Sequence, residues 1–343
     1  MTVVEARGKR RGRTFAFIAM IVVLVLAVLF TAGWFVLARR VDRAVDDLVR
    51  RAAEAGISVA CDGRDVFGYP LQMGVRCEAL SVDAPNRDLR VAAAGASTAA
   101  QFYAPGHAFF ELKAPVRLAG AGAPPMDFDW QSARASVEAW IDGLSRVSIV
   151  LDSPQVALAR PAGDRSPVAQ SDHLEFHAQA RDEDLDIALA DQALKFSAPN
   201  AATLPPLDLA VDVSVHGAAD WLRRGGNGSG ERPSLLGRTG EIRQARLAVV
   251  TDEDADLSVS GPFSVSDEGA ISGDFRLAVG DPAKIANVIK AAAPQAADLA
   301  DSIAATLQLA GSNDEGQRVL PITVRDGMAS VGIIPLGRIP SLR

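Results

Sequence analysis

The feature that most constrains this chain is an uncharged apolar run of 25 residues from Thr14 to Ala38. A helix of this length extends about 37 Å at about 1.5 Å per residue. The hydrocarbon core of a bilayer is about 30 Å thick, so the run can cross a membrane with some tilt. The sequence therefore predicts a transmembrane helix near the N-terminus and a chain divided between two compartments.

The charges that flank the apolar run predict its orientation. Residues 1–13 hold five basic residues and one acid, whereas Arg39 and Arg40 behind the run are soon followed by aspartates. Positive flanks stay in the cytoplasm. We therefore predict a cytoplasmic basic tail over residues 1–13, a signal anchor in the inner membrane over residues 14–38, and the bulk of the chain in the periplasm.

A cleaved signal peptide is the alternative to an anchor. A secretory apolar region has about 7–15 residues and ends at a small-x-small cleavage site. This run is longer and ends in front of two arginines. Arg10-Arg11 resembles a twin-arginine signal, but such a pair arises easily in a basic segment. A lipoprotein signal is disfavoured because the first cysteine is Cys61. We prefer an uncleaved anchor.

The charge balance of the remaining chain excludes some partners. The net charge is −7 for 343 residues. Without residues 1–13 the chain has 30 basic and 41 acidic residues, a net charge of −11. A surface this acidic argues against binding to nucleic acid or to anionic headgroups. Aromatic residues make up only 6%, which favours a core of small aliphatic side chains.

The two cysteines, Cys61 and Cys77, both follow the apolar run. On the predicted topology they lie in an oxidising compartment, where a disulfide is the expected state. Chain entropy gives about 3 kcal/mol for a loop of about 15 residues, although that account is disputed. The alternatives are two buried free thiols or a redox pair, which usually has the closer Cys-x-x-Cys spacing.

The residues after the anchor predict a helix and then a change of period. Residues 41–55 carry apolar side chains at helical spacing, and Gly56 ends the pattern. We predict a stalk helix over residues 39–56 that continues the transmembrane helix; a dimerising coiled coil is the alternative. From residue 57 onward, apolar and polar residues mostly alternate, which indicates strands with one buried and one wet face.

The order of elements predicts a mainly β (α+β) fold, a mostly antiparallel domain over residues 57–343 with a few amphipathic helices. Helices are expected near residues 218–224, from Asp281-Pro282 onward and over residues 296–309. Residues 114–118 are expected to form an edge strand, 119–125 a loop and 335–340 a tail. The glycine-rich residues 225–230 are a flexible loop, with a possible domain boundary near 225–240.

Motif searches give no catalytic site, no cofactor and no nucleotide-binding loop. Of the four histidines, only His173 and His177 are close in sequence. On a strand they would share a face, so a metal pair is conceivable, but no third ligand follows at a familiar spacing. We therefore interpret both as solvent-facing side chains. His107 and His216 lack neighbours that indicate chemistry.

The acidic segment Asp252–Asp256 resembles the start of a calcium loop. It has acids at positions 1, 3 and 5, but Leu257 and Phe263 stand where a calcium loop requires glycine and glutamate. We expect an acidic hairpin turn here and another at Asp182–Asp184. Paired carboxylates could cleave glycosidic bonds, but acids in turns are too common to identify a pair.

Several stretches together resemble one family, an uncharacterised group of Gram-negative envelope proteins known as domain of unknown function 2125. They are the anchor with its stalk helix, Cys61 and Cys77 around residues 66–71, residues 99–105 and residues 320–340. The resemblance implies a membrane-anchored, β-rich periplasmic protein without an assigned reaction. Residues 255–292 are more loosely similar to AsmA-type envelope proteins, which build apolar β grooves implicated in moving lipids.

Three functional hypotheses follow. The first is a non-enzymatic envelope protein whose β groove holds an acyl chain or a strand of a partner protein. The second is a periplasmic hydrolase, which would require a cleft with two facing acids of displaced pKa. The third is a structural subunit of a membrane complex that works through the transmembrane helix. We favour the first, because the strands are rich in small aliphatic residues and no reactive centre is evident.

Overall fold

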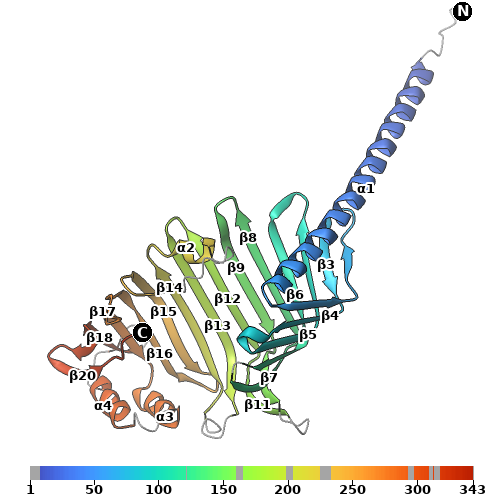
Figure 1. Cartoon of the computed structure of the whole chain (residues 1–343). Helices are drawn as coiled ribbons and strands as arrows, with labels where there is room; N and C mark the ends of the chain where they lie inside the picture. Colours follow the sequence, from blue (N-terminus) through green and yellow to red (C-terminus); the bar gives the residue numbers. More distant parts are fainter. Residues whose placement is uncertain are drawn as a thin grey trace, which may run out of the picture.

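The computed structural model describes residues 8–120, 122–159, 165–197, 204–224, 233–292, 297–308, 312 and 317–342. Within these residues the chain forms one long N-terminal helix and one large antiparallel sheet, with three shorter helices (Figure 1). The predicted fold class, mainly antiparallel β with an N-terminal apolar helix, is confirmed.

The N-terminal helix α1 runs without interruption from Gly8 to Glu54. Its apolar part is long enough to span a membrane, and its C-terminal part is the predicted stalk. The helix ends because Gly56 adopts a left-handed φ of 77°. The Ile57 N–H then donates to the Ala52 carbonyl, which satisfies a carbonyl at the helix end.

The sheet contains 20 strands among the described residues, and every pairing in it is antiparallel. In chain order the strands are β1 Ser58–Asp62, β2 Asp65–Phe67, β3 Gln72–Cys77, β4 Ala79–Ala84, β5 Leu89–Gln101, β6 Ala104–Gly120, β7 Ala123–Asp129, β8 Ser132–Trp140, β9 Gly143–Asp152, β10 Gln155–Ala159, β11 Arg165–Gln170, β12 His173–Arg181, β13 Asp184–Phe196, β14 Leu207–Val215, β15 Thr239–Val249, β16 Asp252–Val265, β17 Ile271–Val279, β18 Arg318–Arg325, β19 Met328–Val331 and β20 Ile334–Arg338.

The middle of the sheet is a simple meander of long strands, three of which are interrupted. β7 and β8 lie end to end beside β6, and β9 with β10 and β12 with β11 continue the same arrangement. The interruptions lie side by side on neighbouring strands. At these points the Gln131 N–H donates to the Asp152 carbonyl and the Ser153 N–H donates to the Asp172 carbonyl. The sheet is therefore bent along one line that crosses several strands.

Three expectations about strands are wrong. Residues 114–118 do not form an edge strand, because β6 is paired on both sides. Pro115 lies at a register shift opposite β5 and between the stretches of β6 that pair with β8 and with β7, so its missing N–H costs no ladder bond. The expected loop 119–125 is shorter, because β7 already begins at Ala123. The expected tail 335–340 mostly belongs to β20, which pairs with β19.

The three short helices cover parts of one face of the sheet (Figure 1). α2 (Ala219–Arg224) packs beside β9 and β12. α3 (Pro282–Ala292) begins as predicted, because the Asp281 carboxylate accepts hydrogen bonds from the N–H groups of Ala283 and Lys284. α3 pairs with α4 (Ala297–Gln308), and together they cover the end of β16–β18. Val279 and Leu307 are almost fully buried there.

The first part of the sheet is fastened to α1. The Arg64 guanidinium, in the turn between β1 and β2, contacts Asp42 at 3.0 Å and Asp46 at 2.8 Å on the helix. A disulfide joins Cys61 of β1 to Cys77 of β3. The ion pairs thus hold the helix to the first strands, and the disulfide holds those strands to one another.

Two expectations concern residues outside the described structure. The glycine-rich segment 225–230 lies outside the described residues, as does the greater part of the basic segment 1–13. On either side of residues 225–232, β14 pairs directly with β15, from Leu207 opposite Val249 to Val215 opposite Gly240.

The packing of α3 and α4 gives a first prediction. Leu307→Ala should lower the free energy of unfolding by about 2–5 kcal/mol, because it leaves a cavity beneath α4. Chemical unfolding of the detergent-solubilised protein would measure this. The matched change Leu48→Ala, at an exposed position of α1, should cost no more than about 0.5 kcal/mol. Equal effects of the two changes would contradict the proposed core.

Candidate functional site

One face of the sheet carries a continuous row of directly paired apolar side chains. Cross-strand pairing links twelve strands, from β3 to β18, through eleven apolar residues and one threonine. This apolar row is Val75, Thr98, Phe110, Ala135, Ile149, Phe176, Leu189, Val211, Ala245, Val259, Leu277 and Leu320. The opposite face is polar, with ion pairs such as Arg243 with Asp186 and Asp212.

The apolar row is mostly uncovered. Only its last two members, Leu277 and Leu320, are buried, because α3 and α4 lie over them. The other members keep part of their surface accessible, and Phe110 is exposed. A sheet face of this kind normally packs against a second layer. Here a broad apolar surface is left available to a ligand.

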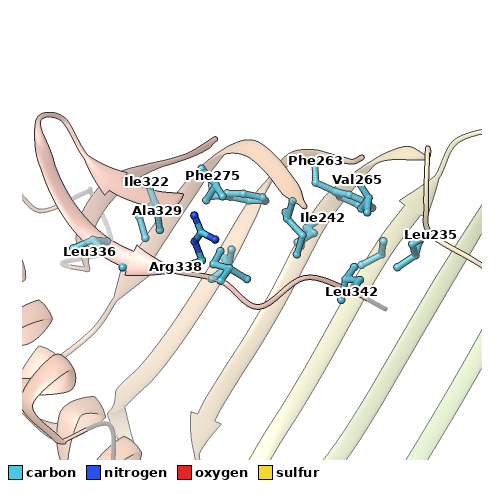
Figure 2. A pocket seen from close by; sticks show the side chains of 16 residues that line it. Leu235, Ile242, Phe263, Val265, Phe275, Ile322, Ala329, Leu336, Arg338 and Leu342 are labelled. Carbon is cyan, nitrogen blue, oxygen red and sulfur yellow. The ribbon is translucent and has the colours of Figure 1, made fainter. Parts of the chain in front are cut away.

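The apolar row leads into a pocket at the C-terminal end of the sheet (Figure 2). The last residues of the chain cross over the strands, held by the Ile339 N–H on the Gly327 carbonyl at 2.7 Å and the Leu342 N–H on the Gly269 carbonyl at 3.0 Å. A cavity of about 570 Å³ lies between this segment and the sheet. This C-terminal pocket is lined by Val213, Leu235, Ile242, Val259, Phe263, Val265, Ile271, Phe275, Ile322, Val324, Ala329, Leu336, Gly337, Arg338, Ile339 and Leu342.

Arg338 is the one charged residue in the lining of the C-terminal pocket. Figure 2 shows its guanidinium among the apolar side chains. Within the described part of the chain, no carboxylate pairs with it. An apolar cavity of this size with one cation has the composition of a site for an amphiphile with an apolar body and an anionic group.

The histidines that the sequence singled out lie on the polar face. His173 Nδ1 is 2.9 Å from Asp152 Oδ1, and its Nε2 is 2.7 Å from Glu175 Oε1. His177 contacts the other oxygen of Glu175 at 3.2 Å. Both imidazoles are thus turned to one carboxylate and do not converge on an open position. The described residues contain no group of three ligands suited to a metal ion.

The same cluster does not form a nucleophilic triad. The Ser132 hydroxyl donates to Asp152, so its proton is directed to a carboxylate and not to an imidazole. Hydrogen bonding to Glu175 and then to Asp152 raises the pKa of His173, while burial opposes the shift. The bond to Ser132 and the bond to His173 lower the pKa of Asp152. Both pKa shifts favour the charged forms of His173 and Asp152, so these residues act as an ion-pair cluster.

The acidic segments of the sequence are also paired. Lys284 of α3 donates to Asp252 at 2.7 Å and to Asp254 at 3.1 Å, so its ammonium occupies the position that a calcium ion would need. In the other acidic segment, His216 and the Gly217 N–H bind Asp184, which lowers the pKa of that carboxyl. Asp182 and Glu183 form the expected turn. The expectation of a turn at Asp252–Asp256 is wrong, because the turn lies at Val250 and Thr251 and Asp252 already begins β16, in which Ala255 and Asp256 are buried.

Asp191 of β13 is a buried acid whose pKa is raised. Its side chain is only 7% exposed, and Oδ1 has no hydrogen-bond partner in the described structure. Burial raises its pKa, Ser171 opposes the rise by hydrogen bonding, and the nearby charge of Asp208 adds to it. Asp191 is enclosed, so it does not supply the open cleft with two displaced acids that a hydrolase would require.

The residues of the C-terminal pocket could not be recognised from the sequence, because their significance depends on the C-terminal segment that crosses the strands. A weak signal exists: Leu336, Ile339 and Leu342 recur at intervals of three residues, which fits a segment with one side on an apolar surface. The hydroxyl of Tyr69, in the turn before β3, lies 2.8 Å from Thr31 Oγ1 on α1.

The His173 cluster predicts a pH-dependent stability. Because folding raises the pKa of His173, the imidazolium stabilises the fold fully below its ordinary pKa of about 6.5. That contribution is lost as the pH rises through the raised value. The lowered pKa values of Asp152 and Glu175 act oppositely: their contribution is present above their ordinary values and is lost as the pH falls.

The test compares wild type with His173→Gln at about pH 5.5 and about pH 8.5, on either side of the ordinary histidine pKa. The variant should be destabilised more at the lower pH, as measured by the free energy of unfolding. Arg134, which is 3.3 Å from Asp152, stays in place in both proteins. His107→Gln controls for loss of a surface histidine. A loss that is independent of pH would contradict the role of the cluster.

At Asp191 we predict that a neutral substitution stabilises the fold, in contrast to the destabilising substitution at His173. A buried acid with a raised pKa is penalised once it ionises, so the penalty is full above the raised pKa and absent below the ordinary one. Asp191→Asn imitates the neutral carboxyl and should raise the unfolding temperature at about pH 7, with no gain below the ordinary pKa of about 3.9. A lower unfolding temperature at neutral pH would show that the charged form is the one that the fold requires.

Comparison with known proteins identifies the family to which the chain is related. The family described as uncharacterized protein conserved in bacteria (DUF2125) matches residues 34–340. A search of curated proteins finds no match. The matched region includes the end of the apolar helix, both cysteines, the whole apolar row and every lining residue of the C-terminal pocket except Leu342. The protein therefore belongs to the DUF2125 family of bacterial proteins.

Proposed function

We propose that this protein is a non-enzymatic inner-membrane protein that holds the acyl chain of an anionic lipid in its C-terminal pocket. The observation that carries the proposal is the pocket itself, a cavity of about 570 Å³ with apolar walls and Arg338 as its one charged lining residue. Ligand pockets are commonly about 300–1,000 Å³ with few polar groups, so the cavity is of suitable size and chemistry.

The apolar row supports the same proposal. It offers a path of uncovered apolar side chains from the part of the sheet beside α1 to the C-terminal pocket. Twelve strands define eleven steps of about 4.8 Å, so the row extends for about 53 Å. An acyl chain that lies across the strands would bury apolar surface at every step, at about 25 cal/mol per Å².

The proposed topology follows from the flanking charges and the disulfide. The basic tail over residues 1–13 would stay in the cytoplasm, residues 14–38 would span the inner membrane, and the stalk over 39–56 would carry the domain over 57–343 into the periplasm. The Cys61–Cys77 disulfide suggests an oxidising compartment for the sheet. On this topology, the protein would contribute to maintaining the cell envelope.

The test is native mass spectrometry of the full-length protein, extracted from membranes in a mild detergent. We expect a bound lipid at about one per chain, with an acidic headgroup. Arg338→Gln should weaken retention of that lipid about ten- to a hundredfold, because a charge-assisted hydrogen bond is worth about 1.5–3 kcal/mol. Ala329→Phe, which narrows the C-terminal pocket, should abolish retention.

Arg276→Gln is the matched control for Arg338→Gln. Arg276 is an exposed arginine of β17 on the polar face, next to pocket residue Phe275 in sequence. Its loss changes the net charge equally but should leave lipid retention unchanged. A wild-type protein free of lipid, or equal losses for the two arginine variants, would overturn the proposal.

A further inference from the structure

A second apolar surface lies at the other end of the sheet, in two turns beside α1. Tyr69 and Leu71 belong to the turn before β3, and Phe102 and Tyr103 form the turn between β5 and β6. All four side chains are exposed, with Leu71 at 61% and Tyr103 at 74%. We call these four residues the aromatic edge.

The aromatic edge contacts the membrane helix within its apolar run. The rings of Phe102 and Phe30 lie 6.4 Å apart, and those of Tyr69 and Trp34 lie 5.6 Å apart. The Trp34 indole N–H also donates to the Gln72 carbonyl at 3.1 Å. These contacts fix the height of the edge relative to the helix.

That height can be compared with the bilayer. Phe30 precedes Ala38 by eight residues and Trp34 precedes it by four, which correspond to about 12 Å and about 6 Å along the helix. The apolar run exceeds a core of about 30 Å by about 7 Å, or by about 3.5 Å on each side if it is centred. Phe30 therefore lies about 8 Å inside the hydrocarbon, and Trp34 lies near its boundary.

From these heights we propose that the aromatic edge inserts into the leaflet from which the sheet emerges. Phe102 reaches the acyl chains beside Phe30, while the Tyr69 ring lies beside Trp34 near the boundary and its hydroxyl is paired with that of Thr31. Tyrosine and tryptophan are enriched at that boundary because each has an apolar ring and a polar group. The ligand of this surface is the lipid bilayer itself, whatever the C-terminal pocket holds.

The sequence around the aromatic edge suits this environment. Residues 66–75 and 91–110 contain no Asp, Glu, Lys or Arg, in a chain of which 22% is charged. A charged side chain in the hydrocarbon is costly, and its absence removes that cost. The acidic surface of the remaining sheet repels anionic headgroups, so insertion must rest on these uncharged turns.

The backbone of the aromatic edge also permits insertion. Lipid cannot satisfy unpaired peptide groups, so these must be paired within the protein. The Phe102 N–H donates to the Leu71 carbonyl at 3.2 Å, and the Gln72 N–H donates to the Gly68 carbonyl at 2.9 Å. Pro70 has no N–H to satisfy. The turns thus present side chains to the lipid and pair much of their own backbone.

The test places a fluorophore at single positions of the full-length protein in nanodiscs of phosphatidylcholine and phosphatidylglycerol. Tyr103→Cys and Leu71→Cys are labelled separately with the NBD fluorophore, without reductant, because Cys61 and Cys77 are joined in the disulfide. Ile333→Cys, in the turn between β19 and β20, is the control because Ile333 is 100% exposed.

We expect NBD at positions 71 and 103 to emit at shorter wavelength than at 333, to be quenched by doxyl-labelled lipid and to be protected several-fold from iodide in water. Two labelled positions keep the test decisive if one variant fails to fold. Iodide quenching equal to that at position 333 would overturn the proposal. Protection from both quenchers would overturn it too, because the edge would then be covered by protein.

Discussion

The backbone hydrogen bonds between neighbouring strands are the interaction on which the rest of this structure depends. From β5 to β18, each strand pairs on both sides in a single layer, and no second sheet among the described residues covers the apolar face. In most β proteins two layers share a core, and the side chains between them supply much of the stability. Here the ladders hold the sheet together, and buried cores are confined to patches beneath α2, α3 and α4.

This arrangement explains why polar chemistry and apolar binding lie on opposite faces. Alternation along each strand sends Glu175 and Asp186 to the polar face and Phe176 and Ile187 to the apolar face. The polar face has partners for its charges, so its carboxylates are stabilised as ions and are poor acids for catalysis. The apolar face has few partners of its own and is therefore the face with capacity for a ligand.

Much of the fold could be predicted from the sequence, because it depends on local patterns. The uncharged run, the helix end at Gly56 and the Asp281-Pro282 helix start were each recognised from neighbouring residues. Pro115 misled the prediction because its tolerance depends on a skipped residue in β5, far away in sequence. Arg338 could not be assigned, since its surroundings come from five or more strands and a tail that meet only in the folded chain. The contact of Tyr69 with Thr31 is equally non-local.

The unbroken course of α1 has a mechanical consequence. The helix continues for 16 residues beyond Ala38, about 24 Å, without a flexible linker. Arg64 forms ion pairs with Asp42 and Asp46 in this stretch, which restrict rotation of the sheet about the helix. A domain joined to its anchor by a flexible linker would sample many orientations relative to the membrane. Here the rigid helix holds the far end of the sheet at a fixed distance and direction from the end of the apolar run.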